Sequence, residues 1–199
     1  MGLYRTGKFW AIEHFDVEPD IIVFGKALTN GLNPLSGVWA RESLIAPDVF
    51  PPGSTHSTFA ANTLGTAVAL ETLRLAAEGD LEGEVSRKGA RFLERLRELH
   101  RQFPRVIGDV DGLGLALRVE LCHADGRTPD RDLADRIFRE ALRGNLVAKG
   151  RPIGLVLDIG GYFKNVFTLA PCFEITDAEI DLAVDLLEQL IRRCAPDRI

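Results

Sequence analysis

Residues 19–28 of the chain read PDIIVFGKAL. The central run, residues 21–24, is short, continuous and apolar, which predicts a strand buried on both faces. Lys26 follows this strand after a single glycine, at the end of a sheet where α/β proteins build their sites. An amine that is partly withdrawn from water there loses its proton more easily and becomes a nucleophile towards carbonyl carbon. An arbitrary lysine is usually exposed to solvent, so the case for a reactive Lys26 depends on the residues around it.

Six motifs follow one another in a fixed order in the first third of the chain. They are RTGKFWA at residues 5–11, EH at 13–14, VEPDI at 17–21, GKAL at 25–28, PLSGV at 34–38 and HSTF at 56–59, with NTL behind at 62–64. In this order they resemble the class III (subgroup II) aminotransferases, which belong to the fold-type I group of pyridoxal-phosphate (PLP) enzymes. The likeness runs from residue 2 to about residue 190. It implies an α/β fold and PLP as the cofactor.

The resemblance also implies roles for three residues. Lys26 matches the family lysine that holds PLP as a Schiff base and then shuttles the proton as a general base. Thr58, with Ser57 beside it, matches the threonine that binds the cofactor phosphate, in this family usually the phosphate of the neighbouring subunit. A helix predicted near residues 62–77 supports this role, because helix N-termini favour phosphate. The alternative is that Ser57, Thr58 or Asn62 only caps that helix.

Family members carry further cofactor-binding elements upstream of the stretch that matches Met1. These are an Asp-Glu-hydrophobic-Gln motif, whose aspartate pairs with the pyridine nitrogen, a glycine-rich phosphate loop and an aromatic residue that stacks on the ring. The sequence therefore resembles the carboxy-terminal half of such an enzyme. We expect these 199 residues alone to lack transaminase activity.

Composition restricts the partners and the compartment. A net charge of −5 gives no basic footprint for nucleic acid or for an anionic membrane surface. No apolar run approaches the roughly twenty residues that a membrane span needs. The three cysteines are odd in number and widely spaced, which argues against a disulfide framework or a zinc site. A cytoplasmic protein without a metal, a nucleic-acid partner or a membrane partner is the resulting expectation.

The pattern of elements divides the chain near residue 80. Residues 1–79 are expected to be the end of the PLP-binding large domain and residues 80–199 the C-terminal small α/β domain. Gly112 and Gly114 resemble a nucleotide loop, but a turn opening a strand is the better interpretation, since a third glycine and a following helix are lacking. The expected helices are 62–77, 81–103, 130–143 and one opening with a capping box at 176–179; the expected strands are 21–24, 35–40, 108–120, 155–157 and 165–169.

One position departs from the family pattern and bears on the substrate. Many glutamate-using members carry an arginine where this chain has Thr168, and that arginine clamps a substrate carboxylate. Glutamate and 2-oxoglutarate are therefore in doubt as the amino pair, and pyruvate or an amine substrate becomes more plausible.

The predicted function is amino transfer between an amino acid or amine and a 2-oxo acid through the Lys26 Schiff base, in a homodimer when the protein is full-length. Three alternatives use the same scaffold and the same lysine: an aminomutase, a decarboxylating transaminase and an epimerase. A fourth is a non-catalytic fragment that retains only packing surfaces.

Overall fold

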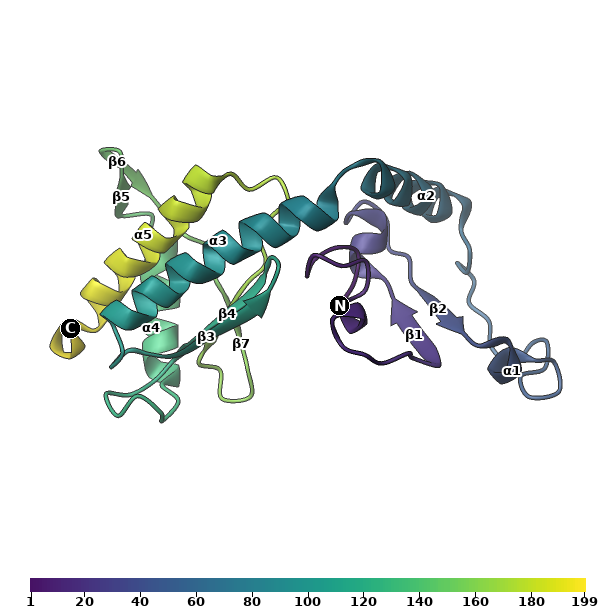
Figure 1. Ribbon diagram of the computed structural model, residues 1–199, viewed down its shortest axis with the longest axis horizontal. Coiled ribbons are helices and arrows are strands. Elements are labelled where there is room, and N and C mark those ends of the chain that lie inside the picture. Colours follow the sequence, from purple (N-terminus) through teal and green to yellow (C-terminus); the bar gives the residue numbers. More distant parts are fainter. The chain divides into compact units, whose positions relative to one another are not determined.

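A computed structural model describes residues 1–199 of the chain. The chain forms two compact units, Met1–Glu82 and Gly83–Ile199, each described here by itself (Figure 1). Both units combine helices with strands, so the predicted α/β class is confirmed. No helix is both long enough and apolar enough to cross a membrane.

The first unit is built on a two-stranded antiparallel sheet. Phe24 packs towards a small core that includes Leu28, and its ring lies 5.6 Å from that of Trp10. The sheet register pairs Val23 with Val38. The elements of this unit are η1 (Ala11–His14), β1 (Ile21–Phe24), η2 (Lys26–Thr29), β2 (Gly37–Ala40), α1 (Glu42–Ile45) and α2 (Thr63–Glu78).

The prediction that residues 21–24 are buried on both faces is wrong for this chain. β1 pairs only with β2, and its side chains alternate between exposed and half-buried. The sequence correctly marked the strand, because a continuous apolar run is typical of a sheet interior. Nothing in the chain covers the side of the sheet that carries Ile21 and Val23, which are both exposed.

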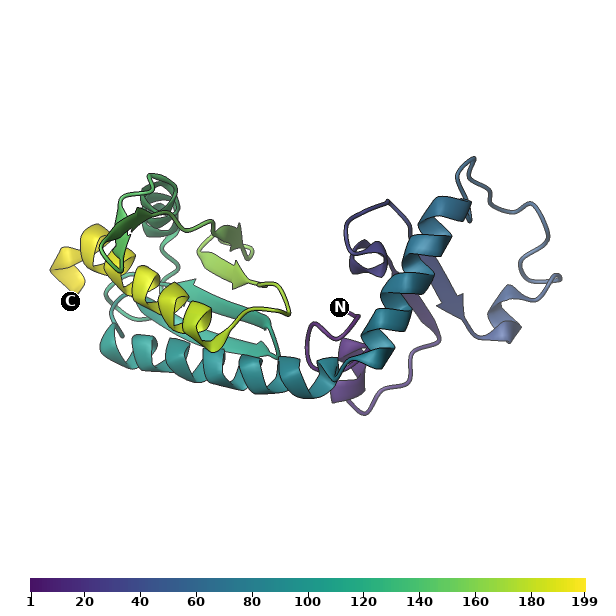
Figure 2. The ribbon, with the colours of Figure 1, turned by 90° about the horizontal axis from the view of Figure 1, so that it is seen from above.

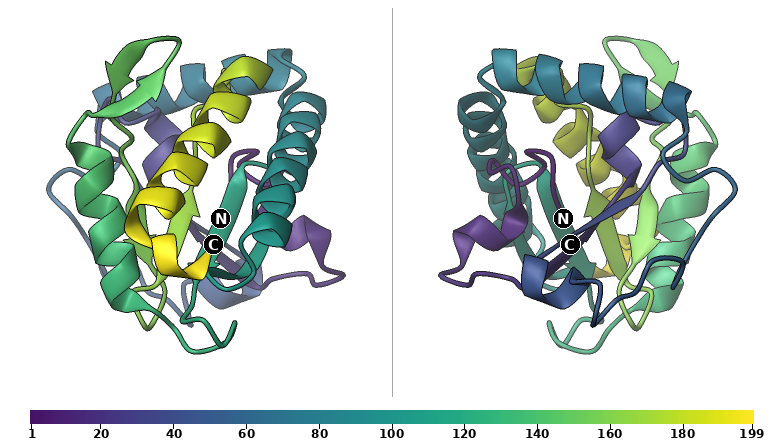
Figure 3. Two further views of the ribbon diagram at one scale, coloured as in Figure 1. Left: turned by 90° about the vertical axis from the view of Figure 1, so that its left-hand side faces the viewer. Right: turned by 90° about the vertical axis from the view of Figure 1, so that its right-hand side faces the viewer.

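The second unit holds a four-stranded antiparallel sheet of order β3-β4-β8-β7 with helices α3, α4 and α5 against one face (Figures 2 and 3). A separate two-stranded sheet pairs β5 with β6. The elements are α3 (Leu81–Gln102), β3 (Ile107–Leu113), β4 (Ala116–Leu121), α4 (Arg131–Leu142), β5 (Leu146–Ala148), β6 (Arg151–Ile153), β7 (Asp158–Gly160), β8 (Val166–Leu169), α5 (Asp177–Cys194) and η3 (Pro196–Arg198).

Residue periodicity explains how this core forms. Leu117, Val119 and Leu121 alternate along β4 and are buried under the helices, while the residues between them lie on the open face. The apolar residues of α3 recur at helical spacing and are buried as predicted; they include Val85, Phe92, Leu96 and Leu99. Burial of both sets in one cluster is what joins the helices to the sheet.

Helices α3 and α5 lie side by side and run in the same direction (Figure 2). Their facing charges are matched: Arg91 donates to Asp181 at 2.6 Å, and Arg95 reaches the same carboxylate at 3.2 Å. The predicted capping box opens α5, since Thr176 Oγ1 accepts from Glu179 N–H and the Glu179 carboxylate accepts from Thr176 N–H.

The turn at Gly114 is confirmed as a hairpin between β3 and β4, with Leu113 paired to Ala116. The predicted strand at residues 155–157 is wrong. Those residues form no strand, and the short strands lie on either side of them, in β6 and β7. The apolar run that suggested a strand is only partly buried, with Leu157 in the core and Val156 exposed.

Candidate functional site

Lys26 begins η2 directly after β1, as the sequence places it. Gly25 precedes it where the chain runs close to the start of β2. A Cβ on Gly25 would lie 3.2 Å from Ser36 Cβ and 3.3 Å from the carbonyl oxygen of Leu35. That contact is tighter than ordinary packing, so glycine at residue 25 lets the lysine turn sit against β2.

Lys26 has a left-handed backbone, with φ of +52°. This conformation costs an L-residue other than glycine roughly 1–2 kcal/mol. Residues held in such conformations cluster at functional sites, where the surrounding structure fixes them. The Lys26 side chain is exposed in this chain. The expected partial withdrawal of its amine from water is therefore not found here, because no element of the chain covers it.

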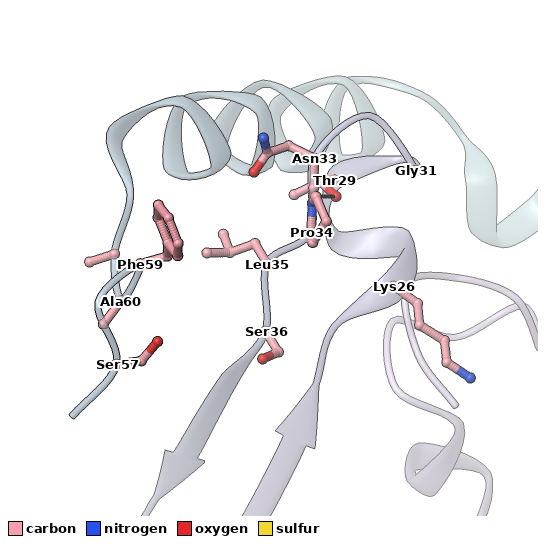
Figure 4. Close-up of a pocket in the computed structure, with 11 residues that line it drawn as sticks. Lys26, Thr29, Gly31, Asn33, Pro34, Leu35, Ser36, Ser57, Phe59 and Ala60 are labelled. Carbon is pink, nitrogen blue, oxygen red and sulfur yellow. Dashed lines mark hydrogen bonds between the residues drawn. The ribbon is translucent and has the colours of Figure 1, made fainter. Parts of the chain in front are cut away.

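A cavity of about 630 Å³ opens beside this turn. Lys26 is the only ionisable residue among its lining residues, so any charge that the lining contributes is positive and favours an anionic ligand. The volume is within the roughly 300–1,000 Å³ of small-molecule and cofactor sites. The lining residues are Lys26, Thr29, Gly31, Asn33, Pro34, Leu35, Ser36, Ser57, Phe59, Ala60 and Ala61 (Figure 4).

Of the two phosphate candidates, Ser57 lines this cavity and Thr58 does not. Thr58 opens the exposed turn at residues 58–61, next to Ser57. Figure 4 shows the amine of Lys26 pointing away from the side of the cavity formed by Ser57 and Phe59. The structure thus places Lys26 and Ser57 at one cavity, but it does not bring the amine onto the hydroxyl groups within one chain.

The capping alternative is resolved by Asn62. Its side-chain oxygen accepts from Gly65 N–H at 2.7 Å and caps α2. Neither Ser57 nor Thr58 is needed for this, and their hydroxyl groups make no hydrogen bond within the chain. Two hydroxyl groups one turn before a helix N-terminus remain available to a ligand.

Sequence reasoning missed the turn that follows Lys26. Thr29 is buried, and its hydroxyl donates to the carbonyl oxygen of Asn33, which closes the turn under the cavity. The helix α2 rests on the same turn, since a Cβ on Gly65 would lie 2.7 Å from Asn33 Oδ1. The asparagine- and glycine-rich run at residues 29–33 was the available signal for this turn.

In the second unit, Thr168 lies on the open face of the four-stranded sheet. Its cross-strand neighbours are Arg118 of β4 and Asp158 of β7. Arg118 donates to Asp109 at 2.7 Å and lies 3.5 Å from Glu120. The guanidinium group beside Thr168 is thus already paired with carboxylates, and the face is acidic around it.

Comparison with known proteins agrees with this arrangement. The sequence model described as aminotransferase class-III matches residues 1–191. The alanine/serine racemase of Pyrococcus horikoshii is 35% identical, over 96% of this chain and 37% of the racemase. The 5-aminovalerate aminotransferase of Pseudomonas putida is 31% identical, over 98% of this chain and 43% of that enzyme.

A solved structure of the ornithine aminotransferase from Toxoplasma gondii, with PLP at partial occupancy in its active site, superimposes with a TM-score of 0.79. It is 29% identical, over 100% of this chain and 42% of its own. The chain belongs to the class-III aminotransferase family, whose members are PLP-dependent enzymes of fold-type I. It spans less than half the length of these relatives.

Proposed function

We propose that Lys26 is the cofactor-binding lysine of a PLP-dependent transaminase that moves an amino group between an amino acid or amine and a 2-oxo acid. One observation carries this proposal: Lys26, whose backbone is held left-handed at the end of β1, is the only ionisable residue that lines the cavity. When bound, PLP supplies an electron sink for the substrate. The Nζ atom of Lys26 would bind the cofactor aldehyde. It would then carry the proton between the α-carbon of the substrate and C4′ of the cofactor.

The residues of the chain fit a phosphorylated cofactor in part. Ser57 and Thr58 offer two hydroxyl groups that the chain itself does not use. As the resemblance implies, we place Thr58 on the cofactor phosphate of a second subunit in a homodimer; the Lys26 amine, which points away from Ser57 of its own chain, is compatible with this placement. Thr58 would hold that phosphate through charge-assisted hydrogen bonds.

The substrate class follows from Thr168. A hydroxyl group cannot replace a bidentate arginine, and the adjacent Arg118 is already paired with Asp109. We assign pyruvate or another monocarboxylic 2-oxo acid as the acceptor, with an amino acid or an amine as the donor.

The domain roles follow the two units. We assign Met1–Glu82 to the end of the PLP-binding large domain and Gly83–Ile199 to the small domain, close to the boundary expected at residue 80. We also place the enzyme in the cytoplasm. The 199 residues alone should not transfer amino groups, because Lys26 is exposed and the strand beside it has only one neighbour.

A racemase or epimerase is the second candidate, since one relative is named as an alanine/serine racemase. Both reactions take a proton from the substrate α-carbon, and Lys26 serves both. The experiment is to give the full-length enzyme L-alanine and PLP with and without a monocarboxylic 2-oxo acid other than pyruvate, since pyruvate would only regenerate alanine. Amino transfer that requires the 2-oxo acid supports a transaminase, and D-alanine formed without it supports a racemase. Turnover unchanged by Lys26→Ala contradicts both.

A further inference from the structure

The turn that carries Lys26 is conformationally strained at several residues. Lys26, Asn30 and Gly31 all have left-handed backbones, with φ of +52°, +49° and +77°. Glycine adopts this conformation freely and asparagine tolerates it, whereas for lysine it is unfavourable. A strained turn persists only where the surrounding structure holds it in place. The contacts that hold residues 25–33 therefore determine where the amine of Lys26 lies.

The backbone of this turn is closed by short-range hydrogen bonds. Their donor N–H groups and acceptor carbonyl oxygens are Leu28 to Gly25 at 3.2 Å, Asn30 to Ala27 at 3.0 Å and Leu32 to Thr29 at 3.0 Å. Each bond joins residues only three positions apart, so together they shape the turn but do not tie it to other elements. Leu28 provides the apolar anchor, because its side chain is buried in one cluster with Ala69 of α2.

Thr29 provides the polar anchor of the turn. Its side chain is 1% exposed, and its hydroxyl group donates to the carbonyl oxygen of Asn33 (Figure 4). It is the only side chain of residues 25–36 that makes a hydrogen bond within the chain. The bond joins the end of η2 to the segment that leads into β2. One buried hydroxyl group thus holds together the two ends of the wall that Lys26, Thr29 and Asn33 give to the cavity.

We infer, on the proposed role of Lys26 as the cofactor-binding lysine, that Thr29 is a positioning residue for the Lys26 amine. It acts through its hydrogen bond to Asn33. The Nζ atom of Lys26 must reach the carbon from which it takes the proton, and a displacement of about 1 Å lowers such a rate about a hundredfold. Thr29 is buried and offers no surface to a substrate. Loss of its hydroxyl group should therefore lower kcat and leave KM nearly unchanged.

The test compares variants of the full-length enzyme that differ in one hydroxyl group. Thr29→Val keeps the branched side chain and removes the hydroxyl, and Thr29→Ser keeps the hydroxyl. Thr72→Val is the matched control, because the Thr72 hydroxyl also donates to a backbone carbonyl, that of Val68 at 2.8 Å, but does not line the cavity. Thr29→Val should lower kcat at least about tenfold with KM within about twofold, and the other two variants should stay within about threefold of wild type. If Thr29→Val does not fold, Thr29→Ala takes its place.

Two further measurements need neither PLP nor activity. Without PLP, the amides of Leu28, Asn30 and Leu32 should exchange hydrogen at least about tenfold faster in Thr29→Val than in wild type or Thr72→Val. A crystal structure of Thr29→Val without PLP should show the Cα atom of Lys26 displaced by about 1 Å.

Three results would overturn the role of Thr29. They are unchanged exchange in the turn of Thr29→Val, an unchanged kcat with Lys26 in its wild-type position, and a Thr29→Ser enzyme as impaired as Thr29→Val. A wild-type enzyme without Lys26-dependent amino transfer would instead contradict the proposed function. The displacement of Lys26, measured without PLP, would then still decide whether Thr29 positions it.

Discussion

Replacing Gly89 by alanine tests a close backbone approach in the second unit. Gly89 lies within α3 where the helix passes the β3–β4 hairpin. A Cβ on Gly89 would lie 2.2 Å from the carbonyl oxygen of Gly114 and 2.5 Å from its Cα. Carbon contacts are optimal near 3.5–4.0 Å, so helix and hairpin must separate by about 1 Å. Overpacking costs about 1–3 kcal/mol, and we expect about 3 kcal/mol here because the backbone of the hairpin cannot move aside as a side chain can. Alanine also stabilises α3 by about 1 kcal/mol through its higher helix propensity. The free energy of unfolding should fall by about 2 kcal/mol.

Urea unfolding followed by circular dichroism measures this change. Ala90→Gly is the control, because it makes the reverse substitution at the next residue of α3, which is exposed. It should lower the free energy of unfolding by about 1 kcal/mol through helix propensity alone. If Gly89→Ala were neutral or stabilising while the control behaved as expected, the close packing of α3 on the hairpin would be refuted.

Three further changes have defined outcomes. Thr176→Ala should cost about 1 kcal/mol in urea unfolding through loss of the α5 cap, and an unchanged midpoint would contradict the cap. Hydrogen bonds from the Thr128 hydroxyl and from the Arg127 and Thr128 N–H groups lower the pKa of Asp125 to about 2. These hydrogen bonds therefore stabilise the loop at residues 125–128 fully above about pH 4, and the stabilisation is lost as the pH falls towards 2. The chemical shift of the Thr128 amide, followed by NMR, should report this titration, and a midpoint near pH 4 would contradict it. In the full-length enzyme, Thr58→Ala should weaken PLP binding by about 1–3 kcal/mol, measured by equilibrium dialysis. An unchanged affinity would contradict the role of Thr58 in binding the cofactor phosphate.

Much of the second unit was predictable because its elements bury their apolar residues within the unit. The periodicity along α3 and the alternation along β4 match what is buried, and the capping box at Thr176 opens α5. The strand at residues 155–157 failed because three apolar residues in a row do not specify pairing. The first unit was harder to predict. The apolar run at residues 21–24 is typical of a strand inside a sheet, whereas β1 pairs only with β2 and is exposed on one side.

The sequence predicted residues of the candidate site but not the geometry around them. Motif order located Lys26 and Ser57, which line one cavity. The left-handed backbone of Lys26, the turn closed by Thr29 and the capping of α2 by Asn62 depend on three-dimensional contacts. These contacts have no periodic signature in the sequence, so only the structure shows them.

The role of Lys26 can be tested by reducing the full-length enzyme with borohydride in the presence of PLP and mapping the labelled peptide. We expect label at Lys26 alone among the five lysines, and loss of label when an amino donor is added before reduction. The other four serve as internal controls: Lys8, Lys88, Lys149 and Lys164. Label spread over these lysines, or an unlabelled Lys26, would contradict the assignment of Lys26 as the cofactor-binding lysine.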